Sequence, residues 1–277
     1  MLSKIFYGKK GCGMDTKALS YAKQLLCLKD GASDCDCRSC QTKETMHPDL
    51  LIMNGEKYLA EDVNTITSFA TKSPVLSNVC VVLVYGMNKI SSAMQNKLLK
   101  DLEDNQTFRL VATAVDFEGI ILDTIKSRTI GENVYPLPKE EFSKLPLSDC
   151  EFYYYLTDGC PERIKDLQDA EPLFREIYQC FANNDFINLF RVLHLVTEKD
   201  KQNFFSKHKE FVTDLFLFME KIYINFFGEN LLDETKRKVF LNRMCVLEEE
   251  RMKSVNNWYS ANDFFLSVCR FIEVKEN

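Results

Sequence analysis

The chain has 277 residues, of which 45% are hydrophobic and 27% charged, a composition that excludes a largely disordered protein. Its net charge of -6 disfavours a protein that binds DNA tightly on its own, because such proteins are usually basic. No apolar run reaches the roughly 18 residues of a membrane span. The first residues, Met1–Gly8, lack the pattern of a signal peptide. The sequence therefore predicts a cytoplasmic protein with reduced cysteines and no membrane association.

Short strands and helices alternate in the first half of the chain. The predicted strands lie at 4–7, 50–53, 79–85 and 109–114, and the predicted helices at 15–26, 60–71, 91–102 and 120–126. This alternation predicts a parallel sheet that is covered by helices on both faces. A segment with Pro136, Pro138 and Pro146 then separates this half from the rest.

The last part of the chain predicts an all-α domain. Phe186, Leu189, Phe190 and Leu193 follow helical spacing, and a second stripe of this kind contains Phe211, Leu215, Phe218 and Ile222. Such stripes could line a ligand pocket, but the core of a helical bundle is the simpler interpretation. Asp233 is predicted to cap one helix, and Ser260 with Asp263 to form the capping box of the last.

A glycine-rich loop joins the first predicted strand to the first predicted helix. Gly8, Gly11 and Gly13 would let successive backbone N–H groups converge on an anion. The phosphate-binding pattern G-x-x-x-x-G-K-[ST] nevertheless has Lys and Ser or Thr where this chain has Met14 and Asp15. We therefore expect this chain to bind no ATP and to have no ATPase activity. The alternative is that the loop is an ordinary turn.

Four of the eleven cysteines lie close together in the sequence, at Cys27, Cys35, Cys37 and Cys40. Four thiolates are a common ligand set for structural zinc, and a small polar loop of this kind needs such a staple. The C-x-C spacing of Cys35 and Cys37 is tighter than the usual C-x-x-C. We interpret the cluster as a zinc site, and the alternative is four free thiols in a mobile loop.

Arg128 and Ser127 follow the short helix predicted at 120–126. In oligomeric nucleotide hydrolases, an arginine at a subunit surface can reach the γ-phosphate bound by a neighbouring subunit. Taken alone, Arg128 is more simply interpreted as a solvated surface residue.

Further short motifs follow in chain order. They are His47-Pro48-Asp49, Asn96-Lys97-Leu98-Leu99-Lys100-Asp101-Leu102-Glu103, Thr124-Ile125-Lys126-Ser127-Arg128-Thr129 and Asp158-Gly159-Cys160-Pro161. With the altered loop and the cysteines, their order over roughly residues 4–160 resembles the delta-prime family of bacterial DNA polymerase III clamp-loader subunits, which are nucleotide-inactive AAA+ proteins. No single motif would suffice for this resemblance.

The resemblance implies an α/β P-loop NTPase-like (AAA+) domain with a parallel sheet at residues 1–136, with a zinc-binding insertion at 27–40. It further implies a small helical lid at 137–169 and an all-α oligomerisation (collar) domain at 170–277. It also implies that the chain is a non-ATPase subunit of a loader with gamma/tau and delta subunits. Such a loader acts on the sliding clamp and on primer-template DNA, so a polymerase (nucleotidyltransferase) label would describe the whole holoenzyme.

The resemblance also assigns roles to residues and shows departures. It implies structural Zn²⁺ at the four cysteines, and a trans arginine finger at Arg128 with Ser127. Residues 85–89 lack the acidic pair that holds magnesium in an active ATPase, which favours nucleotide inactivity. Thr129 stands where the family has Cys, and Asn105 where Pro is usual.

Two alternatives belong to other functional classes. The first is an ATPase subunit of the gamma/tau type, against which Met14 and Asp15 argue. The second is a stand-alone zinc protein that binds nucleic acid, which the acidic net charge disfavours.

Overall fold

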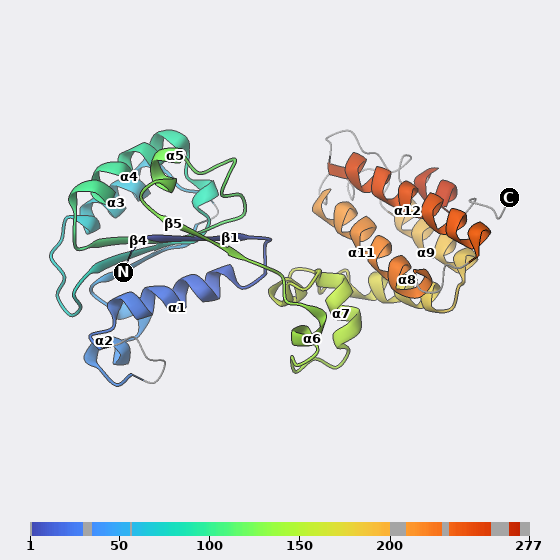
Figure 1. The fold of residues 1–277 in the computed structure, drawn as a ribbon, viewed down its shortest axis with the longest axis horizontal. Coiled ribbons are helices and arrows are strands. Elements are labelled where there is room, and N and C mark those ends of the chain that lie inside the picture. The colour runs from blue at the N-terminus through green and yellow to red at the C-terminus, as the bar shows by residue number, and fades with distance from the viewer. Residues whose placement is uncertain are drawn as a thin grey trace. The chain divides into compact units, whose positions relative to one another are not determined.

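The computed structural model describes residues 2–29, 35–55, 57–199, 209–228, 233–255 and 266–271. The chain divides into two compact units, Met1–Leu137 and Pro138–Asn277 (Figure 1). The predicted division of residues 137–277 into lid and collar domains stays a prediction. Among the described residues, no helix combines the length and the apolar character that crossing a membrane requires.

The first unit is built on a five-stranded parallel sheet. Its strands are β1 (Lys4–Gly8), β2 (Leu50–Met53), β3 (Cys80–Val84), β4 (Phe108–Ala114) and β5 (Ile130–Val134), in the order β2-β3-β4-β1-β5. Every residue of β3 is buried, as its continuous apolar sequence predicts for a central parallel strand. The predicted α/β fold with a parallel sheet is therefore confirmed.

Helices cover both faces of this sheet (Figure 1). Their bounds are α1 (Met14–Leu26), α2 (Arg38–Gln41), α3 (Ala60–Ala70), α4 (Ser92–Asp104) and α5 (Asp123–Lys126), with short 3-10 turns η1 (Glu44–Met46) and η2 (Met87–Lys89). Helix α1 lies against one face, and α3, α4 and α5 lie on the other. The apolar stripe of each longer helix faces the sheet; in α1, for example, Ala18, Ala22 and Leu25 are buried.

Two elements differ from the sequence-based expectation. The sequence indicates no separate strand at β5, because Gly131, Glu132 and Asn133 have low strand propensity; pairing with β1 makes this segment a strand. The helix predicted at 120–126 begins only at Asp123. The side chain of Gln95 accepts a hydrogen bond from the Leu122 N–H at 3.0 Å, which holds the preceding residues outside the helix.

The second unit is helical. Its elements are α6 (Lys139–Phe142), α7 (Cys150–Thr157), η3 (Pro161–Ile164), α8 (Glu171–Ala182), α9 (Phe186–Lys199), α11 (Lys209–Phe227) and α12 (Glu234–Val255); residues 266–271 are also helical. Asp233 caps α12 as predicted, because its carboxylate accepts the Lys236 N–H at 3.0 Å. The predicted capping box of Ser260 and Asp263 lies outside the described residues.

Aromatic side chains form the core of this second unit. Phe174 and Phe218 are fully buried and meet edge to face, with ring centroids 5.0 Å apart. Leu189 and Leu193 of the predicted Phe-rich stripe are buried in the same cluster. The interpretation of the stripes as bundle core is therefore confirmed for these residues. Phe152 and Leu167, which precede residue 170, join the same core.

Candidate functional site

The glycine loop between β1 and α1 has the backbone shape that its glycines predict. Gly11 and Gly13 adopt left-handed conformations, with φ of 82° and 87°, and Gly13 is the N-cap of α1. A side chain at Gly8 would collide with the carbonyl oxygen of Val134, which lies on the neighbouring strand β5. The glycines are therefore required by the backbone, whether or not an anion binds.

In a phosphate-binding loop, two side chains bind the phosphates and the magnesium ion, and this chain has unsuitable residues at both positions. Met14 is 7% exposed, so its side chain packs inside the domain, whereas Asp15 is exposed in the first turn of α1. Burial, and next the charge of Asp15, raises the pKa of the Tyr85 hydroxyl at the end of β3. The Asp15 carboxylate therefore places a negative charge near this end of the sheet, and such a charge repels a triphosphate.

A lysine is fixed in the segment that follows β3. The Lys89 ammonium donates a hydrogen bond to the carbonyl oxygen of Gly55 at 2.7 Å. The Tyr58 hydroxyl lies 2.8 Å from the carbonyl oxygens of both Met53 and Tyr85, so it ties the ends of β2 and β3 together. This edge of the sheet therefore carries a fixed cation in the segment where an active ATPase needs carboxylates.

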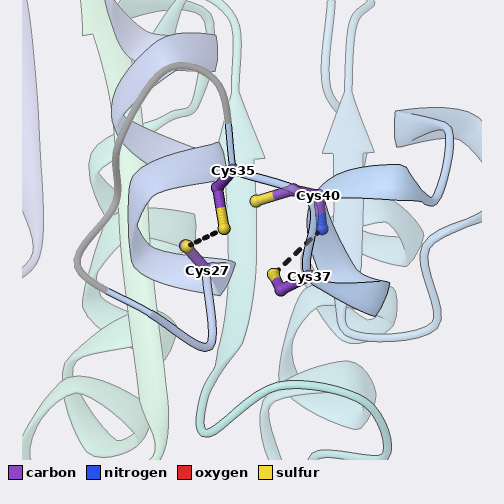
Figure 2. Close-up of side chains that lie close together, drawn as sticks. All are labelled: Cys27, Cys35, Cys37 and Cys40. Carbon is purple, nitrogen blue, oxygen red and sulfur yellow. Dashed lines mark hydrogen bonds between the residues drawn. The ribbon is translucent and has the colours of Figure 1, made fainter.

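The four predicted cysteines come together in space (Figure 2). Their sulfur atoms all lie within 4.8 Å of one another, and the Cys27 and Cys35 sulfurs are 3.5 Å apart. Four thiolates bound to zinc at about 2.3 Å stand about 3.8 Å apart. Cys27 follows α1, Cys37 is the N-cap of α2, and Cys40 lies inside α2, so the turn of α2 brings its two cysteines to one side.

Backbone N–H groups around the cluster favour thiolates. The Lys29 N–H donates to the Cys27 sulfur at 3.4 Å, and the Cys40 N–H donates to the Cys37 sulfur at 3.5 Å. Hydrogen bonds from the Leu28 and Cys40 backbone lower the pKa of the Cys37 thiol to about 6. Burial, and next the neighbouring thiols, raises the pKa of Cys40 instead.

The donor set therefore fits zinc. Thiolates so close together repel one another, and a divalent cation removes that cost. A Cys₄ set also leaves no open position for a substrate, which is typical of structural rather than catalytic zinc.

A buried histidine links this cluster to the sheet. The Nδ1 atom of His47 accepts the Asp49 N–H at 3.1 Å, so the ring proton of the neutral imidazole is on Nε2. That nitrogen lies 2.8 Å from the Oγ atom of Ser39, which stands between Cys37 and Cys40. Burial lowers the pKa of His47, in agreement with a neutral ring.

Asp49, at the other end of the His47-Pro48-Asp49 motif, binds the segment before β3. Its buried carboxylate accepts the N–H groups of Val75 and Leu76 at 2.7 Å and of Ser77 at 2.6 Å. The motif therefore connects the cysteine cluster on one side to the start of β3 on the other. The sequence singled out the motif but did not reveal these partners.

Arg128 lies at the surface just after α5, and its side chain is 33% exposed. Its guanidinium donates to the carbonyl oxygen of Thr124 at 2.7 Å and to the Oγ atom of Ser127 at 3.0 Å. It also pairs with Glu103 near the end of α4. Among the described residues these are its side-chain partners, so the predicted site residues form separate groups: the loop, the cysteines and the arginine.

Comparisons with known proteins agree with this architecture. A solved structure from Thermotoga maritima, described as a DNA polymerase III gamma subunit-related protein, matches with a TM-score of 0.52 and 15% identity. The match covers 99% of this chain and 95% of that one. At this identity the likeness concerns the fold alone. The chain therefore shares the fold of that protein, in which a parallel sheet covered by helices is followed by further helices.

Sequence comparisons find similarity to one family of replication proteins. Residues 2–137 match the family model described as DNA polymerase III, delta subunit. The DNA polymerase III subunit delta' of Bacillus subtilis is 30% identical over 201 residues, which cover 69% of this chain and 59% of that protein. The subunit delta' of Haemophilus influenzae is 28% identical over 138 residues, which cover 48% of this chain and 42% of that protein. These matches support a place for the chain among the delta-prime clamp-loader subunits, and the chain spans less than two thirds of the length of these relatives.

Proposed function

We propose that this chain is a non-ATPase subunit of a DNA polymerase III clamp loader, in which Arg128, with Ser127, serves ATP bound by a neighbouring subunit. The observation that carries the proposal is a contrast within one domain. Its own loop has Met14 and Asp15 at the two positions that bind phosphate and magnesium in an active site, whereas the Arg128 guanidinium lies at the surface. The chain would thus complete a neighbour's site without hydrolysing ATP itself.

The chemistry suits an arginine. Phosphoryl transfer spreads negative charge over the oxygen atoms of the γ-phosphate, and a planar guanidinium binds two such oxygens at once. No covalent step falls to this chain: Arg128 stabilises charge, and Ser127 orients it by accepting one of its N–H groups at 3.0 Å. In loading, the chain would act with gamma/tau and delta subunits on the sliding clamp and on primed DNA, both reached through the complex.

The cysteine cluster has a structural role in this proposal. Zinc bound by Cys27, Cys35, Cys37 and Cys40 would tie the end of α1 to α2, because the four ligands come from both sides of residues 30–34. Bound zinc supplies four strong bonds and charge compensation there. The contact between Ser39 and His47 would then connect the zinc-bound segment to β2, which begins at Leu50.

Two measurements test the proposal. The first is calorimetric titration of the isolated chain with Mg-ATP, for which we expect no saturable binding. Saturable binding with hydrolysis would favour an ATPase subunit of the gamma/tau type.

The second measurement is gel filtration of the chain mixed with the gamma/tau and delta subunits of the same organism, where we expect one complex. Failure to co-elute, together with salt-dependent binding of DNA by the chain alone, would favour a stand-alone zinc protein instead.

A further inference from the structure

Glu103 and Arg128 belong to two different sequence motifs and lie 25 positions apart in the chain, and the fold joins them in an ion pair. Glu103 is near the end of α4, and Arg128 follows α5. The proposed function gives a role to Arg128 but none to Glu103. We propose that Glu103 is a positioning residue that, together with Ser127, presets the Arg128 guanidinium for a neighbour's phosphate. This inference rests on the proposed function of Arg128.

The first support is the rigid base beneath the arginine. Helices α4 and α5 pack together, and Gln95 of α4 is fully buried. Its Nε2 atom donates to the carbonyl oxygens of Ile90 at 3.1 Å and Ile120 at 3.2 Å, and its Oε1 atom accepts the Leu122 N–H. Because Ile125 of α5 is also fully buried, α5 and the residue that follows it are held at a fixed place on α4.

The second support is the number of N–H groups that the arginine uses. A guanidinium has five N–H donors. In Arg128, Nη1 donates to Thr124 and to Ser127, and Nη2 pairs with Glu103. Within the part of the chain that the structure describes, the N–H of Nε and the second N–H of Nη2 have no acceptor, so these two donors are available for a ligand. The side chain is held by three acceptors and still has two N–H groups to offer.

The same contact could instead hold the arginine back until a neighbour arrives. The exposures argue against this, because the Arg128 and Glu103 side chains are 33% and 47% exposed. An ion pair so exposed shifts the equilibrium between its paired and unpaired side-chain conformations by no more than about fivefold. Charge-assisted hydrogen bonds to a phosphate in a closed subunit interface are stronger. The pair is thus too weak to withhold the guanidinium, but sufficient to orient it.

Orientation has a measurable effect. When a free arginine side chain is fixed in one conformation, the lost rotamer entropy weakens the binding equilibrium by about thirtyfold. If Glu103 and Ser127 already hold Arg128 in the required conformation, part of this entropy is lost before the neighbouring subunit binds, and the binding step costs less. We expect removal of Glu103 to lower the kcat of the finger-dependent ATP hydrolysis about three- to fivefold. The KM for ATP should stay unchanged, because the nucleotide is held by the other subunit.

The experiment uses the complete reconstituted loader with substitutions in this chain. Glu103→Ala should lower the Arg128-dependent part of kcat, which is the part that Arg128→Ala removes, by the stated factor. Glu103→Gln should restore most of it, because the amide oxygen can accept the same N–H group. Asp104→Ala, which removes the exposed acid next to Glu103, is the matched control and should leave kcat unchanged. In an Arg128→Ala background, Glu103→Ala should have no further effect, because Glu103 acts through the arginine.

The outcomes separate the two proposals. If Arg128→Ala leaves turnover unchanged in an intact complex, the proposed function itself fails. If Arg128→Ala lowers turnover and Glu103→Ala does not, only the positioning role of Glu103 is wrong. A higher kcat in both Glu103 variants would overturn it in favour of an arginine that is held back.

Discussion

Replacing Asp49 by Asn should destabilise the first unit far more than an ordinary loss of one charge. The Asp49 carboxylate is 1% exposed and accepts three backbone N–H groups, from Val75, Leu76 and Ser77. Two of these, from Leu76 and Ser77, share the oxygen Oδ2. In the Asn variant, an amide group takes the place of one oxygen. If it replaces Oδ2, two partly buried N–H donors face another donor.

The size of the effect follows from these contacts. Hydrogen bonds to a charged group contribute about 1.5–3 kcal/mol each, against about 0.5–1.5 kcal/mol for neutral partners, so the amide weakens all three bonds and removes at least one. We therefore expect Asp49→Asn to lower the free energy of unfolding by about 3–5 kcal/mol. Domains of this size are stable by about 5–15 kcal/mol, so the variant should fold but be fragile.

Urea unfolding at constant m-value measures this change, with the exposed Asp104→Asn as the control. Burial by itself raises the pKa of Asp49, but the N–H donors outweigh it and hold the pKa below its ordinary value. The stabilisation is thus present above the unfolded pKa of about 3.9 and is lost as the pH falls through the lower folded value. A loss below about 1 kcal/mol at pH 7 would refute the reasoning.

Three further predictions concern buried polar groups and the cysteine cluster. Cys37→Ser should reduce zinc from about one ion per chain to well below one by metal analysis; an equal content in both proteins would contradict the site. His47→Ala should speed zinc loss to a chelator about tenfold, because the partner of Ser39 is removed. Asp101→Asn should raise the free energy of unfolding by about 1 kcal/mol at pH 7, because burial raises the pKa of Asp101 and its Oδ2 has no partner among the described residues.

The Asp101 gain depends on pH in a known direction. Because the folded pKa lies above the unfolded one, ionisation costs stability as the pH rises, and the gain from Asn should vanish below about pH 4, where both states are protonated. An equal gain in the free energy of unfolding at pH 7 and below about pH 4 would show that ionisation of Asp101 is not its cause.

Local patterns in the sequence were sufficient for most elements of the first unit. The apolar run before Tyr85 has no polar break, so only a buried strand fits it, and β3 occupies its centre. The stripe of Ala18, Ala22 and Leu25 likewise fixes the buried face of α1. The four cysteines were also predictable as a group, because they are few residues apart and the turn of α2 brings Cys37 and Cys40 together.

Contacts between distant residues were not predictable. β5 is a strand because it pairs with β1, 126 positions away at Lys4 and Ile130, and its own sequence does not favour one. The partnership of Glu103 with Arg128 depends on how α4 packs on α5, which hydrophobic periodicity does not specify. The same holds for His47, whose contact with Ser39 follows from the fold of the cysteine loop.

The most direct test of the central claim is steady-state ATP hydrolysis by the complete loader, stimulated by clamp and primed DNA, with Arg128→Ala in this chain. An arginine finger contributes about 10³–10⁵ in related hydrolases, so its loss should abolish hydrolysis at the site that Arg128 serves and lower the overall rate by at least the share of that site. The account predicts that reduction while the complex elutes unchanged from gel filtration. A rate within experimental error of wild type, in an intact complex, would contradict it.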